Sequence, residues 1–229
     1  MNMESKSFDF NAFVADSKKA LLSPEEYFSS MPAEGGLAAP VIKALIYGAA
    51  AGVLNLIWSS FNIGVGGIFG AGVGVMVFIG SIIGALLGLF IGAVIILILS
   101  AIANGKTDFE PMVHVQGALL VIMPVSAFVN VFSAIHPTLG SFLNLAVNLY
   151  LLYMLFFAMT KTLNAKVDVS KIIVIVLGVL LILMFFVGLA TRGISRAYRG
   201  WQQAELKEVI YKREKPDEGS FCTFHSFCS

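Results

Sequence analysis

The stretch GSIIGALLGLFIG, residues 80–92, decides the fold class of this chain. Glycine recurs at every fourth position, at Gly80, Gly84, Gly88 and Gly92, and the residues between are apolar apart from one serine. Glycine costs about 1 kcal/mol relative to alanine inside a helix in water. In a bilayer, small residues at four-residue spacing let two helices approach closely. The stretch therefore predicts a membrane-spanning helix that carries a packing groove, a glycine zipper.

Charged residues are scarce and segregated in the rest of the chain. Of the 229 residues, 58% are hydrophobic and 13% are charged, whereas a soluble domain has about a quarter charged. No Asp, Glu, Lys or Arg occurs in residues 44–105, 112–160 or 172–191. Uncharged apolar runs of about 20 residues are typical of transmembrane helices. The composition thus predicts an all-α membrane protein.

Five spans are predicted, at residues 41–60, 76–103, 112–134, 139–160 and 171–190. A sixth span would need a turn within residues 61–103 without a polar residue to satisfy its backbone, which hydrocarbon does not tolerate. We expect a five-span transmembrane helical bundle over residues 41–191. It is preceded by a polar, interfacial region at 1–40 and followed by a C-terminal helix and flexible tail at 192–229.

The N-terminal region is expected to lie at the membrane surface. Apolar residues near helical spacing, at Phe10, Phe13, Val14 and Leu21, indicate a short interfacial amphipathic helix, with a partly disordered tail as the alternative. In SPEEYF, residues 23–28, the serine precedes a proline that suits the first position of a helix, and a glutamate follows three residues after the serine. This pattern predicts a capping box and a helix from Pro24. Its aromatic residues and Met31 are expected to anchor it at the interface.

Lysine and arginine give no clear orientation. Five spans place eight of these residues on one side and seven on the other, so the positive-inside rule does not decide. The early charges favour a cytoplasmic N-terminus, and Arg192, Arg196 and Arg199 oppose it.

The first span offers a row complementary to the glycines of the second, Ala44, Gly48 and Gly52. We expect the two helices to cross closely along these rows, or the second span to pair with another copy. The segment between the spans, NIGVGGIFGAGVG at 62–74, is apolar and uncharged. It is interpreted as a surface hairpin or a re-entrant segment, with an ion filter as the less favoured reading.

Polar side chains within the spans are few and neutral. Asn144 and Asn148 are four residues apart and share a helix face. They are expected to hydrogen-bond to another span, and a substrate site on that face is the alternative. No acidic residue lies within a span, which argues against a carboxylate proton relay.

No enzymatic constellation is visible, and no catalytic residue, cofactor or resident metal is predicted. CTFHSFC at 222–228 offers three metal-binding side chains at a non-standard spacing. An unstructured tail is favoured over a metal clip. After the last span, the arginines at 192, 196 and 199 recur at helical spacing beside Tyr198 and Trp201. These residues suit contact with lipid headgroups, and an ordinary solvated helix end is the alternative.

The order of these features resembles a known family. SPEEYFSSMP at 23–32, the glycine-rich second span, GKTDFEPMVHVQGALLVIMP at 105–124 and the last two spans from residue 137 to 183 are similar to the Yip-one (Ypt/Rab-interacting) domain family in its bacterial form. The resemblance covers roughly residues 24–190. It implies a five-span protein with a cytoplasmic N-terminus, here in a bacterial cytoplasmic membrane. Eukaryotic members are linked to Rab GTPases, but their Asp-Leu-Tyr-Gly-Pro element is absent here, so a Rab-type partner is doubtful.

From the residues and the resemblance together we expect a non-enzymatic membrane scaffold, organising or trafficking-like factor. It would act through helix packing, self-association or a membrane-protein partner, and contacts with membrane lipids, without nucleic acid. A small-solute transporter or channel is the alternative. Its path would be lined by the 62–74 segment and the face of Asn144 and Asn148.

Overall fold

The computed structural model describes residues 10–32, 35–61 and 71–214, and for residues 71–73, 192–206 and 208–214 it describes the backbone alone. The chain forms two compact units, Met1–Leu183 and Met184–Ser229. Over the described residues the regular structure is entirely helical. The elements are α1 (Phe10–Leu22), α2 (Pro24–Ser30), α3 (Ala38–Ser60), α5 (Ala71–Ile102), α6 (Phe109–Leu119), α7 (Ile122–Val129), α8 (Phe132–Ile135), α9 (Pro137–Phe157), a π-helical turn η1 (Ala158–Thr162) and α10 (Val167–Glu214).

Five helical segments are long and apolar enough to cross a membrane, which confirms the predicted number. They are Ala38–Ser60, Gly74–Ile102, Phe109–Ile135, Pro137–Thr162 and Val167–Thr191. Each predicted span lies within about five residues of an observed one at both ends, which is the usual uncertainty of helix ends read from sequence. The chain is therefore an all-α, multi-pass membrane protein.

The third span is broken into three helices, α6, α7 and α8. Pro124 has no amide hydrogen to donate to the carbonyl of Leu120, and its ring clashes with that carbonyl. The Leu120 carbonyl instead accepts from the amide of Met123, at 2.9 Å, and α6 ends there. A second interruption follows at Asn130 and Val131.

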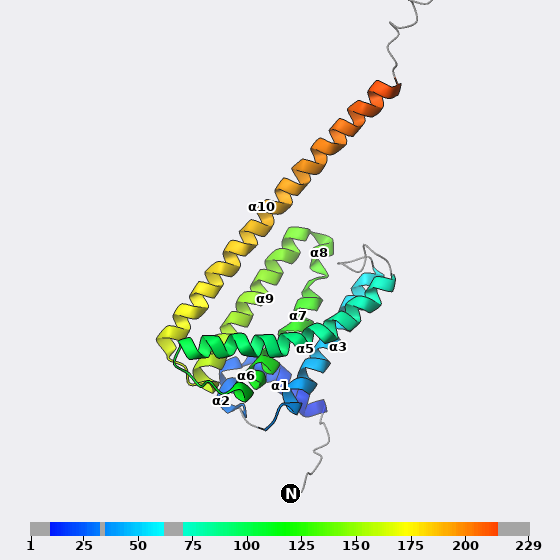
Figure 1. Ribbon diagram of the computed structural model, residues 1–229. Coiled ribbons are helices and arrows are strands. Elements are labelled where there is room, and N and C mark those ends of the chain that lie inside the picture. The colour runs from blue at the N-terminus through cyan, green and yellow to red at the C-terminus, as the bar shows by residue number, and fades with distance from the viewer. Residues whose placement is uncertain (1–9, 33–34, 62–70, 215–229) are drawn as a thin grey trace, which may run out of the picture. The chain divides into compact units, whose positions relative to one another are not determined.

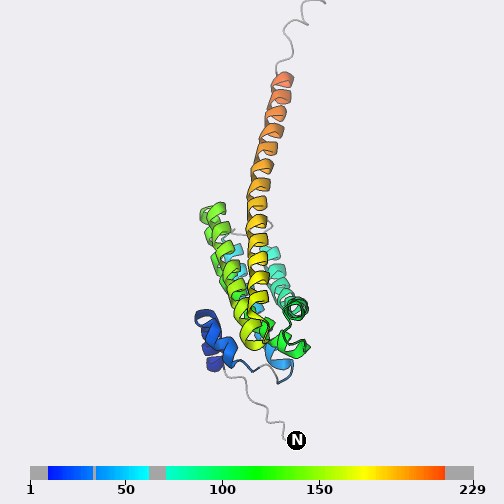
Figure 2. The ribbon, with the colours of Figure 1, turned by 90° about the vertical axis from the view of Figure 1, so that its left-hand side faces the viewer.

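The spans of the first unit pack around α3 and α5. The helix α3 contacts α5, α6 and α7, while α9 contacts α7 and α8. Figure 1 shows α5 lying steeply across the direction of α7 and α9. The view turned by 90° agrees, because part of α5 is then seen end-on (Figure 2).

Two tight turns join at one end of this unit, and we call residues 103–108 and 163–166 together the clasp. The amide of Lys106 donates to the carbonyl of Leu163, at 2.8 Å. The amide of Lys166 donates to the carbonyl of Ala103, at 3.0 Å. The clasp thus connects the end of α5 to the start of α10.

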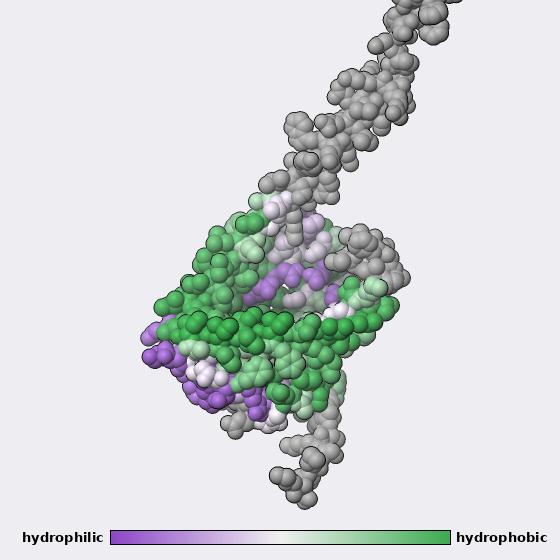
Figure 3. Space-filling model, in the orientation of Figure 1, coloured by the Kyte–Doolittle hydropathy of each residue, from purple (hydrophilic) through white to green (hydrophobic). Residues whose placement is uncertain are grey.

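The core of the first unit gathers where α2, α6, η1 and the clasp meet. Its fully buried side chains include Phe28, Met112, Met154, Met159 and Leu163. Most of the other apolar side chains of the spans are exposed, especially along α5 and α10. Figure 3 shows this hydrophobic surface over α5 and α9, with hydrophilic residues at the α2 end and in a hollow between α5 and α9. Such an exposed apolar surface suits a lipid environment.

The N-terminal helices form as predicted but are held differently. A helix does start at Pro24, but Ser23 makes no side-chain cap. In a capping box the Glu26 side chain would accept from the backbone amide of Ser23. That amide instead donates to the carbonyl of Lys19, at 2.9 Å, and Glu26 forms an ion pair with the Lys19 ammonium, at 2.8 Å. Phe28 is buried in the protein core, with 1% of its surface exposed, so its predicted place at the membrane interface is wrong.

The fifth span continues without a break into the C-terminal region. The helix α10 is 48 residues long and has no end near residue 191. The CTFHSFC segment lies outside the described residues, as do residues 62–70.

Candidate functional site

Helices α1 and α2 form an N-terminal cap over one end of the spans. Phe13 and Ala20 of α1 are buried, whereas Phe10 and Val14 are exposed, so only part of the predicted apolar face of α1 is covered. The ring of Phe13 lies 5.2 Å from that of Tyr47 on α3. The cap is therefore packed against the first span rather than lying apart from it.

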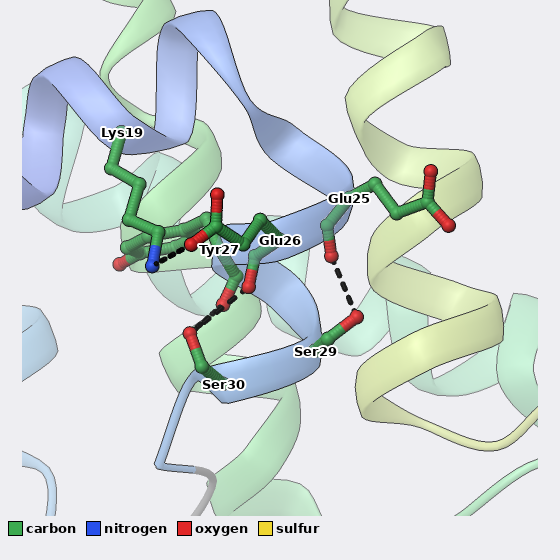
Figure 4. Close-up of polar contacts among 6 residues, drawn as sticks. All are labelled: Lys19, Glu25, Glu26, Tyr27, Ser29 and Ser30. Atoms are coloured by element: carbon green, nitrogen blue, oxygen red, sulfur yellow. Dashed lines mark hydrogen bonds and ion pairs between the residues drawn. The ribbon is translucent and has the colours of Figure 1, made fainter.

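Polar contacts fasten the cap to three other elements. Figure 4 shows α2 with its ion pair from Glu26 to Lys19 and its serine hydroxyls bonded to backbone carbonyls one turn earlier. Glu25 forms an ion pair with Lys161 of η1, at 2.7 Å. These pairs are half-exposed, so each contributes no more than about 1 kcal/mol.

The cap also makes neutral hydrogen bonds, one of them buried and two partly buried. The hydroxyl of Thr162 donates to the carbonyl of Phe28, at 2.7 Å, and both residues are buried. The hydroxyl of Tyr150 donates to the carbonyl of Leu21. The Ser17 and Tyr47 hydroxyls share a hydrogen bond of 2.7 Å. Sequence reasoning missed this network, because its members lie up to 134 residues apart.

Tyr27 is the one cap residue with a strongly shifted pKa among the described groups. Burial raises its pKa from 10.0 to about 12, and the nearby negative charge of Asp16 adds to the shift. The Lys43 ammonium donates to the Tyr27 hydroxyl, at 3.1 Å. The phenol is thus a neutral structural group at physiological pH.

The intramembrane amides bond within the chain. The side-chain amide of Asn144 donates to the Asn130 side chain at 3.0 Å and to the carbonyl of Gly140 at 3.1 Å. The side-chain amide of Asn148 donates to the carbonyl of Asn144 on the same helix, at 2.8 Å. One of the two asparagines thus bonds to another span, and the other bonds within α9.

The glycines of α3 and α5 do not face each other as predicted. A Cβ at Gly48 would lie 2.8 Å from the Cβ of Ala85, and one at Gly52 would lie 2.8 Å from the Phe78 ring. These two glycines let α3 approach α5 closely. The α5 residues that they meet are larger than glycine.

Most of the α5 glycine row lies open in the single chain. At Gly80, Gly84 and Gly88 an added Cβ would meet no atom within 4 Å. Only Gly92 is filled, by the side chain of Gln116 on α6, whose amide donates to the Gly88 carbonyl at 3.2 Å. The predicted pairing of the two rows within one chain is therefore wrong for the first three glycines. Contact with another copy stays a prediction.

The remaining predicted site residues lie on α10 beyond the membrane span. Arg192, Arg196, Arg199, Tyr198 and Trp201 are all within the helix, but their side chains lie outside the described part of the structure. Their predicted headgroup contacts stay a prediction. Among the described residues no group of three or more His, Cys, Asp or Glu side chains could hold a metal ion.

The comparison with protein families decides the identity of the fold. The family model of the Yip1 domain matches residues 18–190, which include the end of α1, α2, the clasp and, to within one residue, all five spans. The chain belongs to the Yip1 domain family. The match agrees with the resemblance drawn from the sequence. No curated protein and no solved structure gives a match. The Yip1 domain is that of a multi-pass membrane protein and is not known as an enzymatic domain.

Proposed function

We propose that this Yip1 domain protein is a non-enzymatic membrane scaffold that organises other membrane components through helix packing. The observation that carries the proposal is the open row of Gly80, Gly84 and Gly88 on α5. At other glycines, such as Gly48 and Gly140, neighbouring residues of the same chain already occupy the space beside the Cα. In a bilayer, small residues at this spacing favour close approach of another helix.

The intramembrane amides support the same proposal. A solute site needs polar groups that converge on the solute. Here the amides of Asn144, Asn148 and Gln116 donate to other groups of the chain. Their hydrogen-bonding capacity contributes to the fold.

Gentle native purification followed by mass spectrometry tests the scaffold. We expect a stoichiometric membrane-protein partner or a homo-oligomer, lost on Gly84→Leu. The matched control is Val94→Leu, because Val94 is another exposed position on α5. A chain that is monomeric and without a partner before any substitution would refute the proposal. A Rab-type GTPase is not proposed as the partner, for want of the family's Asp-Leu-Tyr-Gly-Pro element.

A small-solute transporter or channel is the second candidate, favoured by the broken third span. Interrupted helices at membrane depth are found where they line a polar path. The break at Asn130 lies beside Asn144, and Figure 3 shows hydrophilic residues in the hollow between α5 and α9. Substrate-dependent flux through reconstituted vesicles, lost on Asn144→Leu, would establish this function in place of the scaffold.

The lysines of the clasp favour a cytoplasmic N-terminus, in the bacterial cytoplasmic membrane that the resemblance suggests. The turns at the clasp end hold Lys106 and Lys166, whereas residues 61–73 and His136, which connect spans at the other end, contain no lysine or arginine. Short loops rich in lysine lie in the cytoplasm. Labelling of Lys166→Cys and Thr138→Cys from the two sides of the membrane, in a chain lacking Cys222 and Cys228, tests this orientation.

A further inference from the structure

The two turns of the clasp have related sequences. Asn104-Gly105-Lys106-Thr107-Asp108 and Asn164-Ala165-Lys166-Val167-Asp168 share the pattern Asn-small-Lys-x-Asp and stand 60 positions apart. The same offset aligns Gly80-Ser81, on α5, with Gly140-Ser141, on α9. It also pairs Ser100 with Thr160. One offset therefore relates the second span and its turn to the fourth span and its turn.

The backbone of the clasp repeats with the sequence. Asn104 and Asn164 have φ of 53° and 52° and are the non-glycine residues with positive φ among those described. Asparagine is the residue other than glycine that tolerates this conformation best. The offset of 60 relates Lys106 to Lys166 and Ala103 to Leu163. The hydrogen bond from the Lys106 amide to the Leu163 carbonyl therefore has an equivalent, from the Lys166 amide to the Ala103 carbonyl, and both bonds are present. Such reciprocal bonds are what a two-fold axis through the clasp produces.

The helices that leave the clasp also correspond. In the first half α5 leads into the clasp and α6 leaves it, and in the second half α9 leads in and α10 leaves. Gly92 of α5 accommodates Gln116 of α6. Leu152 of α9, the equivalent of Gly92, lies 3.8 Å from where a Cβ of Gly178 on α10 would be, two residues beyond the equivalent of Gln116, Val176. In both halves the helix that enters the clasp thus contacts the helix that leaves it.

The equivalent of the open glycine row is already covered in the second half. Gly80 and Gly84 of α5 correspond to Gly140 and Asn144 of α9. Gly140 lies against Ser133 of α8, and Asn144 is bonded to Asn130 at the end of α7. The third span therefore covers this row on α9. Under the two-fold relation, Asn130 corresponds to residue 190 of α10 and Asn144 corresponds to Gly84 of α5. The relation therefore assigns the fifth span, α10, to the glycine row on α5.

The face of α10 that this assignment requires is free. Its stripe Val179, Leu183, Phe186 and Ala190 is exposed. The other side of the first turns is occupied, because Val169, Ile173 and Leu177 pack against the core of their own chain. These contacts and the clasp fix the first turns of α10. The stripe thus offers exposed apolar side chains to a second copy.

We propose that the Yip1 domain of this protein is an internal duplication of a helix–turn–helix unit, and that the stripe of α10 in one copy docks onto Gly80, Gly84 and Gly88 of α5 in a second copy. Each copy offers both surfaces, so a two-fold arrangement of two copies satisfies both contacts and closes as a dimer. This interface rests on the proposed scaffold function and gives it a first partner, the chain itself.

Disulfide cross-linking tests the interface in the full-length protein in its membrane. Cys222 and Cys228 are replaced by serine, and two differently tagged chains are co-expressed, one with Gly84→Cys and the other with Ala190→Cys. The pair is equivalent to Asn144 and Asn130, so we expect a disulfide-linked dimer that carries both tags. The control pairs Ala190→Cys with Ile98→Cys, which is also exposed on α5 but lies about 21 Å further along the helix. Loss of the cross-link is expected there, because a disulfide needs Cα atoms within about 7 Å.

The outcomes separate this interface from the scaffold. No cross-link above the control, in a chain that native mass spectrometry shows to be oligomeric or partnered, overturns the interface and leaves the scaffold standing. A chain that carries both cysteines and cross-links only within itself overturns the second copy as the occupant. Gly84→Leu provides a test without cysteines, since a Cβ added there meets no atom of its own chain within 4 Å. Loss of the dimer with an unchanged melting temperature of the monomer supports the interface, and an undiminished dimer overturns it.

Discussion

Alanine at Gly48 and alanine at Gly84 should have opposite effects, although the two glycines look alike in the sequence. At Gly48 an added Cβ would lie 2.8 Å from the Cβ of Ala85, 3.0 Å from the carbonyl oxygen of Ser81 and 3.1 Å from the Cα of Ile82. Two of these atoms belong to the α5 backbone, which cannot rotate away. The α3 and α5 axes must therefore separate.

Overpacking of this kind costs about 1–3 kcal/mol. For a chain of 150–250 residues each kcal/mol lowers the melting temperature by roughly 2–4 °C, so Gly48→Ala should lower it by about 2–12 °C. At Gly84 the Cβ meets nothing within 4 Å, and alanine is the better helix former. Gly84→Ala should leave the melting temperature unchanged or raise it slightly.

The assay is thermal unfolding of the purified protein in detergent at a concentration where it is monomeric, followed by size-exclusion chromatography of the soluble fraction. Gly52→Ala serves as a second test of the same interface, because its Cβ would lie 3.1 Å from the carbonyl oxygen of Phe78. Equal melting temperatures for Gly48→Ala and the unmodified protein, or an equal loss for Gly84→Ala, would show that α3 and α5 do not meet through the α3 glycines.

Three further predictions concern the cap, the spans and the clasp. Because burial raises the pKa of Tyr27 to about 12, the folded state keeps a proton that the unfolded state releases near pH 10. Stability should be complete below pH 10 and fall between pH 10 and 12, by on the order of 2 kcal/mol; Tyr27→Phe should flatten this part of the pH profile of the melting temperature. Asn144→Leu removes the bond to the Asn130 side chain, so it should cost about 1 kcal/mol and leave the oligomer unchanged in native mass spectrometry; loss of the oligomer would implicate this face in assembly. Asn104→Ala and Asn164→Ala place a less tolerant residue at positive φ and should each destabilise by about 1 kcal/mol, whereas glycine at either position should not; unequal losses by thermal unfolding would argue against the two-fold clasp.

Hydropathy was sufficient to predict the number of spans, because runs without charge are long and are separated by charged or polar turns. It was not sufficient for the interior of the third span. Pro124 predicts a weak point in a helix, but not that α6 ends five residues earlier or that a second break follows at Asn130. Those ends depend on which carbonyls find another donor, which is settled by local geometry.

The glycine rows show a different limit of sequence reasoning. Spacing alone identifies a row of small residues but not which helix faces it, because the rotation of α5 about its axis is set by its neighbours. Phe78 and Ala85 turned out to face α3, and Gly84 did not. The contacts of the cap could not be predicted from the sequence. The hydroxyls of Thr162 and Tyr150 donate to the carbonyls of Phe28 and Leu21, and no local sequence pattern indicates a contact over so long a separation.

The bonds from the cap to the fourth span have a consequence for biosynthesis. Phe28 is synthesised 134 residues before Thr162, to which its carbonyl is bonded. At about 5–20 residues per second, the ribosome needs roughly 7–27 seconds to cover that distance. During this interval the rings of Phe13 and Phe28, buried in the finished protein, have no complete binding surface and must be shielded by lipid or by a chaperone. The cap helices α1 and α2 thus reach their final positions only after the fourth span has been made.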